Sequence, residues 1–471
     1  MAAQNKPSLR GGTTKQTAET KRNVEPGKKQ AVQKETSLRG QDARRNDAAT
    51  SSKQTVQSKR NAKSKEPRIP ALRFKEFEGE WEKVKFGKLA EFKNGLNFGK
   101  EQEGTGLKVI GVGDFKNHMS ISYDSLSKVN IPESHKEAFL LKDNDLLFVR
   151  SNGNKDLIGR ALFLNKVKEE IGYSGFTIRA RFNQGLEIHP YFYAIFFKSA
   201  APKKQFLLLG GGTNISNLNQ QILSGLEIPK PSLPEQQKIA SFLSAVDKKI
   251  QQLTKKKELL EDYKKGVMQQ LFTGKLRFKD EYGNEFPDWE EKRLGEVMQL
   301  PEKVKPTNFN VDKLLTVKLH TKGLFKNNNT ESLKLGATNY FVRRKGQFIY
   351  GKQNLFNGAF GIIPDEFDGF YSSGDIPSID FIPKKVVPNF VLFYLSRKNY
   401  YSRLENIASG SGSKRIHEKT FLEIKVKFPS LEEQQKIANY LSAIDTKIEA
   451  VNQQIEKTQE FKKGLLQRMF V

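Results

Sequence analysis

Two polar stretches of this chain carry side chains of the kinds that hydrogen-bond to the edges of nucleic acid bases. The first follows the short apolar run 146–149 directly, and the second follows the run 348–350 after one glycine. Each is accompanied further along the chain by a second polar stretch rich in glycine or serine. Base recognition requires such side chains on loops that a rigid domain holds in place. The candidates are Arg150, Ser151, Asn152, Asn154, Lys155, Thr213 and Asn214 in the first half of the chain, and Lys352, Gln353, Asn354, Ser411, Ser413, Lys414 and Arg415 in the second.

These stretches could also be ordinary surface turns, because polar, glycine-rich loops are common in that role. Their matched placement favours a shared function instead: Arg150 and Lys352 stand 202 residues apart, and both glycine-rich stretches precede the same downstream motif. Nearby aromatic residues are expected to belong to the core rather than to stack on bases. They are Phe148, Tyr173, Tyr350 and Tyr371.

The charge of the chain predicts a polyanionic partner. Among 471 residues there are 80 Lys and Arg against 53 Asp and Glu, a formal net charge of +27. Such an excess points to nucleic acid or an anionic membrane surface. The chain has no cysteine, which excludes disulfides, Cys-ligated zinc, iron–sulfur clusters and thiol nucleophiles. No apolar run is long enough to span a bilayer and no secretory signal is visible, so we expect a cytoplasmic protein.

Residues 1–67 differ in composition from the rest. They contain no Phe, Tyr or Trp, and carry sixteen Lys or Arg against six acidic residues. A segment of this kind cannot bury enough apolar surface to offset the entropy of ordering. We expect a disordered basic tail with no specific function.

From residue 68 onward the chain is an internal repeat. The segment from Pro231, PSLPEQQKIA, recurs from Pro429 as PSLEEQQKIA, a shift of 198 residues. Upstream, Trp81-Glu82 is matched by Trp289-Glu290. Repeats of this size indicate duplicated structural units. We therefore divide the chain into a tail (1–67), a first domain (68–230), a central long helix (231–275), a second domain (276–428) and a C-terminal long helix (429–471).

Each repeated motif opens a predicted helix with apolar residues at alternating steps of four and three. This spacing is typical of a coiled-coil seam, and its length suits a long partner helix better than a globular surface. The other copy is the natural partner, although each helix could instead pack on its own domain. The predicted seam residues are Ile239, Leu243, Val246, Ile250, Leu253 and Leu260 in the first helix and Ile437, Leu441, Ile444, Ile448, Val451 and Ile455 in the second.

The ends of the helices carry further signals. Ser232 with Glu235, and Ser430 with Glu433, fit the capping-box pattern of a helix start. Gly274 is expected to end the first helix in the left-handed conformation. Glycine inside each helix, at positions 266 and 464, costs about 1 kcal/mol relative to alanine, so we expect either a close helix crossing or a bend there.

The two variable regions alternate short apolar runs with helical segments. Residues 146–149 and 348–350 are predicted strands, and residues 191–199 and 389–397 are predicted helices. The predicted fold is α/β (α+β): two similar mixed domains separated by an antiparallel pair of long helices, with a pseudo-twofold internal repeat.

Motifs for catalysis are missing. No Gly-Lys pair is followed by Ser or Thr, so there is no phosphate-binding P-loop. Val109 to Asp114 contains two glycines of a dinucleotide fingerprint but is better explained as a turn at a strand end. The five histidines lack metal-ligand spacing. Asp288 and Glu290 resemble a nuclease carboxylate pair, but they flank Trp289 in a repeated segment that we interpret as a packing element at the domain start.

The paired PSLxEQQKIA segments, each followed by Leu-Ser-Ala-Val/Ile-Asp-x-Lys-Ile, resemble the specificity subunits of type I restriction–modification systems. The resemblance covers residues 68–471 and includes both Trp-Glu domain starts. It implies two target-recognition domains, each reading half of a bipartite double-stranded DNA site, with no metal or catalytic residue in this chain.

The resemblance also implies partner subunits. Two modification subunits would supply S-adenosylmethionine-dependent adenine methylation, and restriction subunits would use ATP and Mg²⁺ to translocate and cleave DNA. The tail before residue 68 departs from the family pattern. Two other hypotheses stay open at this point: a DNA methyltransferase or nuclease acting alone, and a coiled-coil scaffold that binds DNA without sequence preference.

Overall fold

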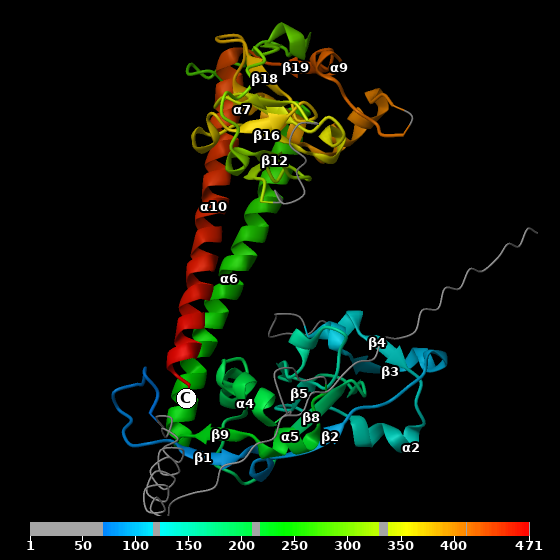
Figure 1. Ribbon diagram of the computed structural model, residues 1–471, viewed down its shortest axis with the longest axis vertical. Coiled ribbons are helices and arrows are strands. Elements are labelled where there is room, and N and C mark those ends of the chain that lie inside the picture. The colour runs from blue at the N-terminus through cyan, green and yellow to red at the C-terminus, as the bar shows by residue number, and fades with distance from the viewer. Residues whose placement is uncertain (1–68, 116–122, 210–216, 329–337, 411, 471) are drawn as a thin grey trace, which may run out of the picture. The chain divides into compact units, whose positions relative to one another are not determined.

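A computed structural model describes residues 69–115, 123–209, 217–328, 338–410 and 412–470 (Figure 1). The predicted basic tail lies outside these residues. The strands of the first half are β1 (Glu82–Lys85), β2 (Ala90–Asn94), β3 (Glu103–Ile110), β4 (Ser127–Val129), β5 (Leu146–Val149), β6 (Ala161–Phe163), β7 (Ile171–Tyr173), β8 (Thr177–Phe182) and β9 (Glu227–Lys230). Its α-helices are α2 (Glu133–Lys136), α3 (Pro190–Phe196), α4 (Ala201–Leu209), α5 (Gln220–Gly225) and the long α6 (Leu233–Phe272).

The second half has a similar order of elements, with one more strand among the described residues and without a helix equivalent to α2. The strands are β10 (Glu290–Arg293), β11 (Met298–Gln299), β12 (Leu315–Val317), β13 (Leu324–Lys326), β14 (Tyr340–Val342), β15 (Phe348–Tyr350), β16 (Phe360–Ile362), β17 (Tyr371–Ser373), β18 (Ser378–Phe381) and β19 (Lys425–Phe428). The helices are α7 (Pro388–Ser396), α8 (Lys398–Tyr401), α9 (Glu418–Leu422) and the long α10 (Leu431–Arg468).

Both halves build the same antiparallel four-stranded sheet. Its strand order is β2-β8-β5-β6 in the first half and β11-β18-β15-β16 in the second. The predicted strands β5 and β15 occupy equivalent inner positions, and their apolar residues are fully buried. The prediction of two similar mixed domains is therefore confirmed, and Phe148, Tyr173, Tyr350 and Tyr371 are core residues as expected.

A two-stranded pair closes each domain next to its long helix. β1 pairs with β9, and β10 pairs with β19, both antiparallel over four residues. Because β9 and β19 immediately precede α6 and α10, this pairing attaches the Trp-Glu domain start to the beginning of the long helix. Trp81 is buried against Phe192, and Trp289 contacts Phe390 at the equivalent place, which confirms the packing role predicted for these segments.

The long helices α6 and α10 lie side by side and antiparallel (Figure 1). Lys264 forms an ion pair with Asp445 at 2.6 Å, and Asp247 forms the same pair with Lys462. The repeat shift of 198 residues relates the two lysines to each other and the two aspartates to each other, so one ion pair is the duplicate of the other. Every predicted seam residue is buried or half-buried, and the predicted helix pair is confirmed.

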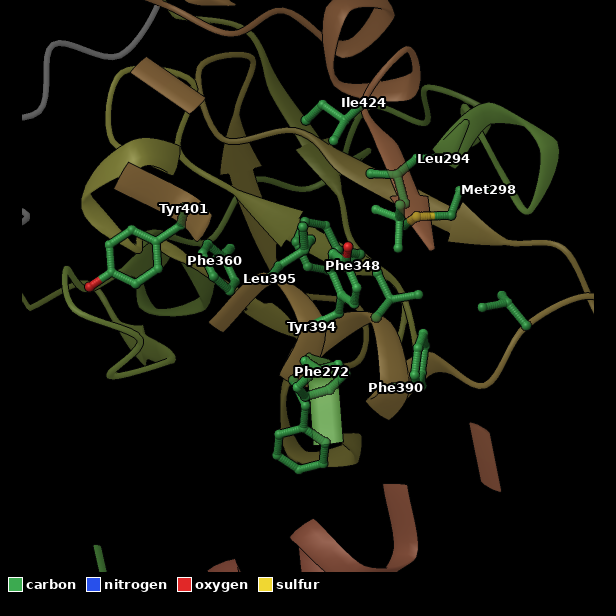
Figure 2. Packing of buried hydrophobic residues seen from close by; sticks show 14 of the residues in the cluster. Phe272, Leu294, Met298, Phe348, Phe360, Phe390, Tyr394, Leu395, Tyr401 and Ile424 are labelled. Carbon is green, nitrogen blue, oxygen red and sulfur yellow. The ribbon is translucent and has the colours of Figure 1, made fainter. Parts of the chain in front are cut away.

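The ends of both helices also belong to the domain cores, which the seam pattern did not predict. The core of the first domain includes Leu243 from the start of α6, Leu465 from the end of α10 and Phe470, which follows α10. The core of the second includes Phe272 from the end of α6, which Figure 2 shows among Phe390 and Tyr394. Each helix is thus anchored at both ends by apolar burial.

The predicted capping box is wrong in both halves at the start of α6, and at the start of α10 only its serine half is confirmed. Ser430 accepts a hydrogen bond from the N–H of Glu433 at 3.3 Å, but Ser232 makes no side-chain cap. The carboxylates of Glu235 and Glu433 do not reach back to the helix start, because other donors bind them. Arg73 binds both oxygens of Glu235 at 2.7 and 2.8 Å, and the Trp81 indole donates to the same carboxylate at 3.1 Å.

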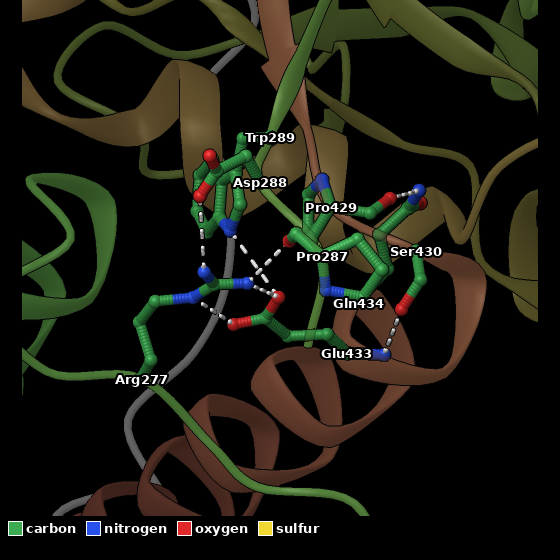
Figure 3. A network of polar contacts seen from close by, with 8 residues as sticks. All are labelled: Arg277, Pro287, Asp288, Trp289, Pro429, Ser430, Glu433 and Gln434. Atoms are coloured by element: carbon green, nitrogen blue, oxygen red, sulfur yellow. Dashed lines mark hydrogen bonds and ion pairs between the residues drawn. The ribbon is translucent and has the colours of Figure 1, made fainter. Parts of the chain in front are cut away.

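The second copy repeats this arrangement, which we call the carboxylate clamp: Arg73, Trp81 and Glu235 in one domain and Arg277, Trp289 and Glu433 in the other. Arg277 binds both oxygens of Glu433 at 3.2 and 2.7 Å, and the Trp289 indole donates at 3.2 Å (Figure 3). In each copy, the hydrogen bond to the glutamate raises the pKa of the arginine. The clamp joins the domain start to the long helix.

The glycines inside the long helices do not mark a close approach of the two helices. A Cβ atom on Gly266 or Gly464 would meet nothing within 4 Å, so the expectation of a close helix crossing is wrong. Gly274 follows the last turn of α6 with a φ of +73°, and ends the helix as predicted.

Candidate nucleic-acid interface

The first candidate interface consists of residues 150–155 and the turn 174–176, which the fold brings together. The N–H of Arg150 donates to the carbonyl of Phe176 at 2.8 Å, and one guanidinium nitrogen of Arg150 donates to the carbonyl of Gly175 at 3.4 Å. This contact arises because β5 and β8 are neighbours in the sheet, so the residues after β5 meet the turn before β8. The carbonyl of Arg150 also accepts from the N–H of Leu218, just beyond the glycine-rich stretch.

Side chains of the first interface are organised by local hydrogen bonds. Oδ1 of Asn152 accepts from the N–H of Asn154 at 2.8 Å, and Oδ1 of Asn154 accepts from the N–H of Asp156 at 3.0 Å. These bonds use the amide oxygens for turn structure. Asn154 and Lys155 are exposed, whereas Arg150, Ser151 and Asn152 are half-buried.

The second candidate interface consists of residues 352–354, the turn 374–377 and residues 412–415. The N–H of Lys352 donates to the carbonyl of Asp375 at 2.9 Å, and the carbonyl of Lys352 accepts from the N–H of Ile416 at 2.9 Å. These two bonds have the same pattern as those of Arg150. The sequence match between Arg150 and Lys352 therefore corresponds to the same place in both domains.

Ion pairs dominate the second interface. Nη1 of Arg415 lies 2.8 Å from Oδ1 of Asp375. With the Gln353 amide oriented to satisfy its neighbours, the Gln353 oxygen accepts from Nη2 of Arg415 at 2.8 Å. Lys414 pairs with Glu405 at 2.7 Å, and Ser413 is exposed. Asn354 is half-buried and its Oδ1 accepts from the amide of Asn357. The guanidinium of Arg415 is held between an acid and an amide in a defined orientation.

Lys352 is engaged within the protein. Its ammonium lies 3.0 Å from Glu418, and both side chains are mostly buried. Although burial opposes it, hydrogen bonding to the backbone and to Lys352 lowers the pKa of Glu418. The Lys352 ammonium therefore positions the start of α9 against the loop, and its backbone shapes the interface.

A buried arginine supports the turn 374–377. Arg343 donates to the hydroxyl of Ser372 at 2.6 Å and to the carbonyl of Ile376 at 3.0 Å. It is 4% exposed, and this burial lowers its pKa to about 10, so the side chain is still charged at neutral pH. The turn that carries Asp375 is thus fixed from inside the domain.

The predicted candidates Thr213, Asn214 and Ser411 lie outside the described residues. The structure brings together the other members of each set. Sequence reasoning missed Phe176, Asp375 and Glu418. Phe176 and Asp375 stand 199 residues apart. The pairing of β5 with β8 and of β15 with β18 brings them to Arg150 and Lys352, and no local signal in the sequence indicates this pairing.

Other kinds of site are not found among the described residues. No group of three or more His, Asp or Glu there could hold a metal ion. In the same part of the chain, no helix has the length and apolar character needed to cross a membrane. Val109 to Asp114 forms the end of β3 and a short turn in which Asp114 accepts from the N–H of Gly111, as predicted. Arg277 donates to the Pro287 carbonyl, and the exposed carboxylate of Asp288 lies 3.8 Å from Nη1 of the same arginine, as part of the domain start.

Comparison with protein families gives a match to the type I restriction modification DNA specificity domain, over residues 78–262 and 287–459. The two matched ranges correspond to the two halves of the repeat. The chain belongs to this family. It is a specificity subunit of a type I restriction–modification system that recognises DNA targets, and is itself non-catalytic.

Individual relatives match this chain over most of their length. The MjaVIII specificity subunit of Methanocaldococcus jannaschii is 25% identical over 423 residues, which cover 83% of this chain and 94% of that protein. The putative MjaX specificity subunit of the same organism is 26% identical over 427 residues, covering 85% and 95%. The crystal structure of the type I S subunit from M. genitalium has the same fold, with a TM-score of 0.52 at 16% identity over 86% of this chain and 99% of that one.

Proposed function

We propose that this specificity subunit reads a bipartite double-stranded DNA target, with residues 68–230 and 276–428 each recognising one half-site. One observation carries the proposal: both domains build the same loop interface, on the same sheet position, with different side chains. Two such readers related by a pseudo-twofold axis suit two half-sites separated by a fixed gap. The long helices, in segments 231–275 and 429–471, set that gap.

In this proposal, other chains carry out the methylation and cleavage of DNA. Two modification subunits dock on the duplicated surfaces and methylate adenine with S-adenosylmethionine, and restriction subunits use ATP and Mg²⁺ to translocate and cleave. The complex works in the cytoplasm. A duplicated docking surface supports two copies of one partner, because equivalent surfaces bind equivalent chains.

The positive charge supplies affinity that does not depend on sequence. Contacts to phosphates give dissociation constants on the order of 10⁻⁴ to 10⁻⁶ M and weaken steeply with salt. Selection between sequences then comes from the loop side chains. Arg150 and Arg415 are the strongest candidates, because arginine can bind the two acceptors of guanine together.

Mapping of adenine methylation tests the proposal. The subunit is expressed with its modification subunits in a host that lacks other methyltransferases, and methylated adenines are located across the genome. The expected pattern is one two-part motif with a constant gap. Exchange of residues 68–230 for the same region of a relative should change one half of the motif only. A single continuous motif, or methylation without sequence preference, would contradict two independent readers.

A further inference from the structure

One exposed aromatic side chain stands at the centre of the first interface. Phe176 is 64% exposed, the highest value for any phenylalanine among the described residues. It lies in the turn between β7 and β8, and its carbonyl accepts the hydrogen bond from the N–H of Arg150. A large apolar ring is thus presented to solvent directly beside a candidate base-reading arginine.

The turn that carries Phe176 is held on both sides. The N–H of Gly175 donates to the carbonyl of Leu96 at 2.6 Å, and the N–H of Thr177 donates to the carbonyl of Ser174 at 2.9 Å. On the flank formed by Gly95, a Cβ atom would lie 2.1 Å from the Ser174 carbonyl, so only glycine permits this approach. The backbone of Phe176 is therefore fixed, and ordering it on binding costs little entropy.

An exposed apolar residue is by itself unremarkable on a protein surface. A second observation, independent of this exposure, comes from the equivalent turn of the second domain. The equivalent position in its turn is Asp375, whose carbonyl accepts from Lys352 as that of Phe176 accepts from Arg150. The Asp375 side chain faces outward to orient Arg415. The position is thus used in both domains to present a side chain at the candidate interface.

We infer that Phe176 contacts bases of the first half-site through its apolar ring and helps to determine which bases the first domain accepts. The inference rests on the proposed function, because it requires that the first domain reads DNA. Phenylalanine reads bases in two known ways, by packing on the methyl group of thymine or by inserting at an unstacked base step. Both place the ring against the apolar part of a base.

The test compares two variants of the full subunit assembled with its modification subunits. Phe176→Ala removes the ring, and Tyr282→Ala is the matched control, because Tyr282 is 81% exposed but lies outside both interfaces. Affinity is measured on a duplex with the mapped target and on one with a scrambled first half-site. Loss of a base contact predicts about 10- to 100-fold weaker binding of Phe176→Ala to the target, no change on the scrambled duplex, and no change for the control.

The outcomes separate the inference from the proposed function. Equal weakening on both duplexes, or no weakening on either, overturns the role of Phe176. If the unmodified complex does not distinguish the duplexes, the proposed function fails and the inference with it. Should thermal unfolding show that Phe176→Ala is destabilised, Phe176→Leu keeps apolar bulk without the ring, and a change in target preference with unchanged unfolding still supports the base contact.

Two further measurements identify the mode of contact. Thymines of the first half-site are replaced one at a time by uracil, which lacks the methyl group. A penalty seen with the unmodified subunit but absent with Phe176→Ala assigns the thymine contact. Enhanced fluorescence of 2-aminopurine placed in the half-site, lost with Phe176→Ala, assigns insertion at an unstacked step instead.

Discussion

The two candidate interfaces share a backbone and differ in the chemistry of their side chains. In both, a residue just beyond the inner strand, Arg150 or Lys352, donates its N–H to the neighbouring turn, and its carbonyl accepts from a residue beyond the variable loop. The first interface presents an aromatic ring and an arginine that donates to a carbonyl. The second presents an arginine that is already paired with an acid. The fold therefore keeps the reading position constant while the side chains change.

The different side chains of the two interfaces favour different kinds of contact with DNA. An acid beside Arg415 lowers the attraction of the second interface for phosphate, but it holds the guanidinium in one orientation, as pre-organised contacts require. The first interface lacks such an acid at the turn and relies on a fixed apolar surface. We expect the second half-site to be selected by hydrogen bonding and the first in part by apolar contact.

The largest expected effect comes from lengthening both helices together. Insertion of one heptad after Leu253 and another before Glu456 keeps the seam in register, since Lys257 faces Asn452 in this region. Seven residues add about 10 Å, which corresponds to about three base pairs. Methylation mapping should show both half-sites unchanged and the gap longer by that amount.

The single insertion is the control for this experiment. Because each helix is anchored at both ends in the domain cores, seven residues in α6 alone cannot be accommodated without loss of packing. We expect loss of stability rather than a new gap. An unchanged gap after the matched insertion would show that the helices do not set the spacing.

Loss of the glutamate of the carboxylate clamp should destabilise the two domains to a similar extent. Glu433 is fully buried and bound by Arg277 and Trp289. Glu433→Ala removes the acceptor of the half-buried Arg277 and of the Trp289 indole, which costs about 2–4 kcal/mol of unfolding free energy. Glu235→Ala should cost a similar amount. Urea unfolding of the full chain measures both, and a loss below about 1 kcal/mol in either domain would contradict a structural role for the clamp.

A smaller effect is expected from the acid and the arginine of the second interface. Arg415→Ala should weaken binding of the target by about 1–3 kcal/mol if the guanidinium reads a base. Asp375→Asn should lose part of this selectivity, because the amide orients Arg415 less strongly. The matched change Arg150→Ala should affect the first half-site instead.

Binding to duplexes with one half-site scrambled at a time measures these effects. An equal loss on every duplex, with a shallower salt dependence, would identify Arg415 as a phosphate contact. A loss at both half-sites from either variant would remove the distinction between the two interfaces.

Local patterns predicted the elements well. Strand β5 and strand β15 coincide with the apolar runs from which they were expected, and α6 begins directly after Ser232. The seam pattern also predicted that α6 and α10 pair, because the two copies were the only stripes of matching length. The signals that predicted these elements come from residues that lie close together in the sequence.

The features that the sequence patterns did not predict depend on contacts between residues far apart in the chain. Glu235 fits a capping box by position, but its carboxylate binds Arg73, which lies 162 residues away in sequence. Phe176 and Asp375 join the candidate interfaces only through the pairing of β5 with β8 and of β15 with β18. A single sequence does not reveal strand order, so these residues could not be assigned in advance.

The smallest expected effect concerns the glycines inside the long helices. Gly266 and Gly464 have open space at the Cβ position and no positive φ, so alanine fits both without strain. Alanine should stabilise each helix by about 0.5–1 kcal/mol, through its higher helix propensity and its less flexible unfolded state. Urea unfolding of Gly266→Ala and Gly464→Ala checks this. If the free subunit becomes more stable but binds the modification subunits more weakly, a partner needs the space beside the glycine. If the free energy of unfolding falls instead, the open environment described for these positions is wrong.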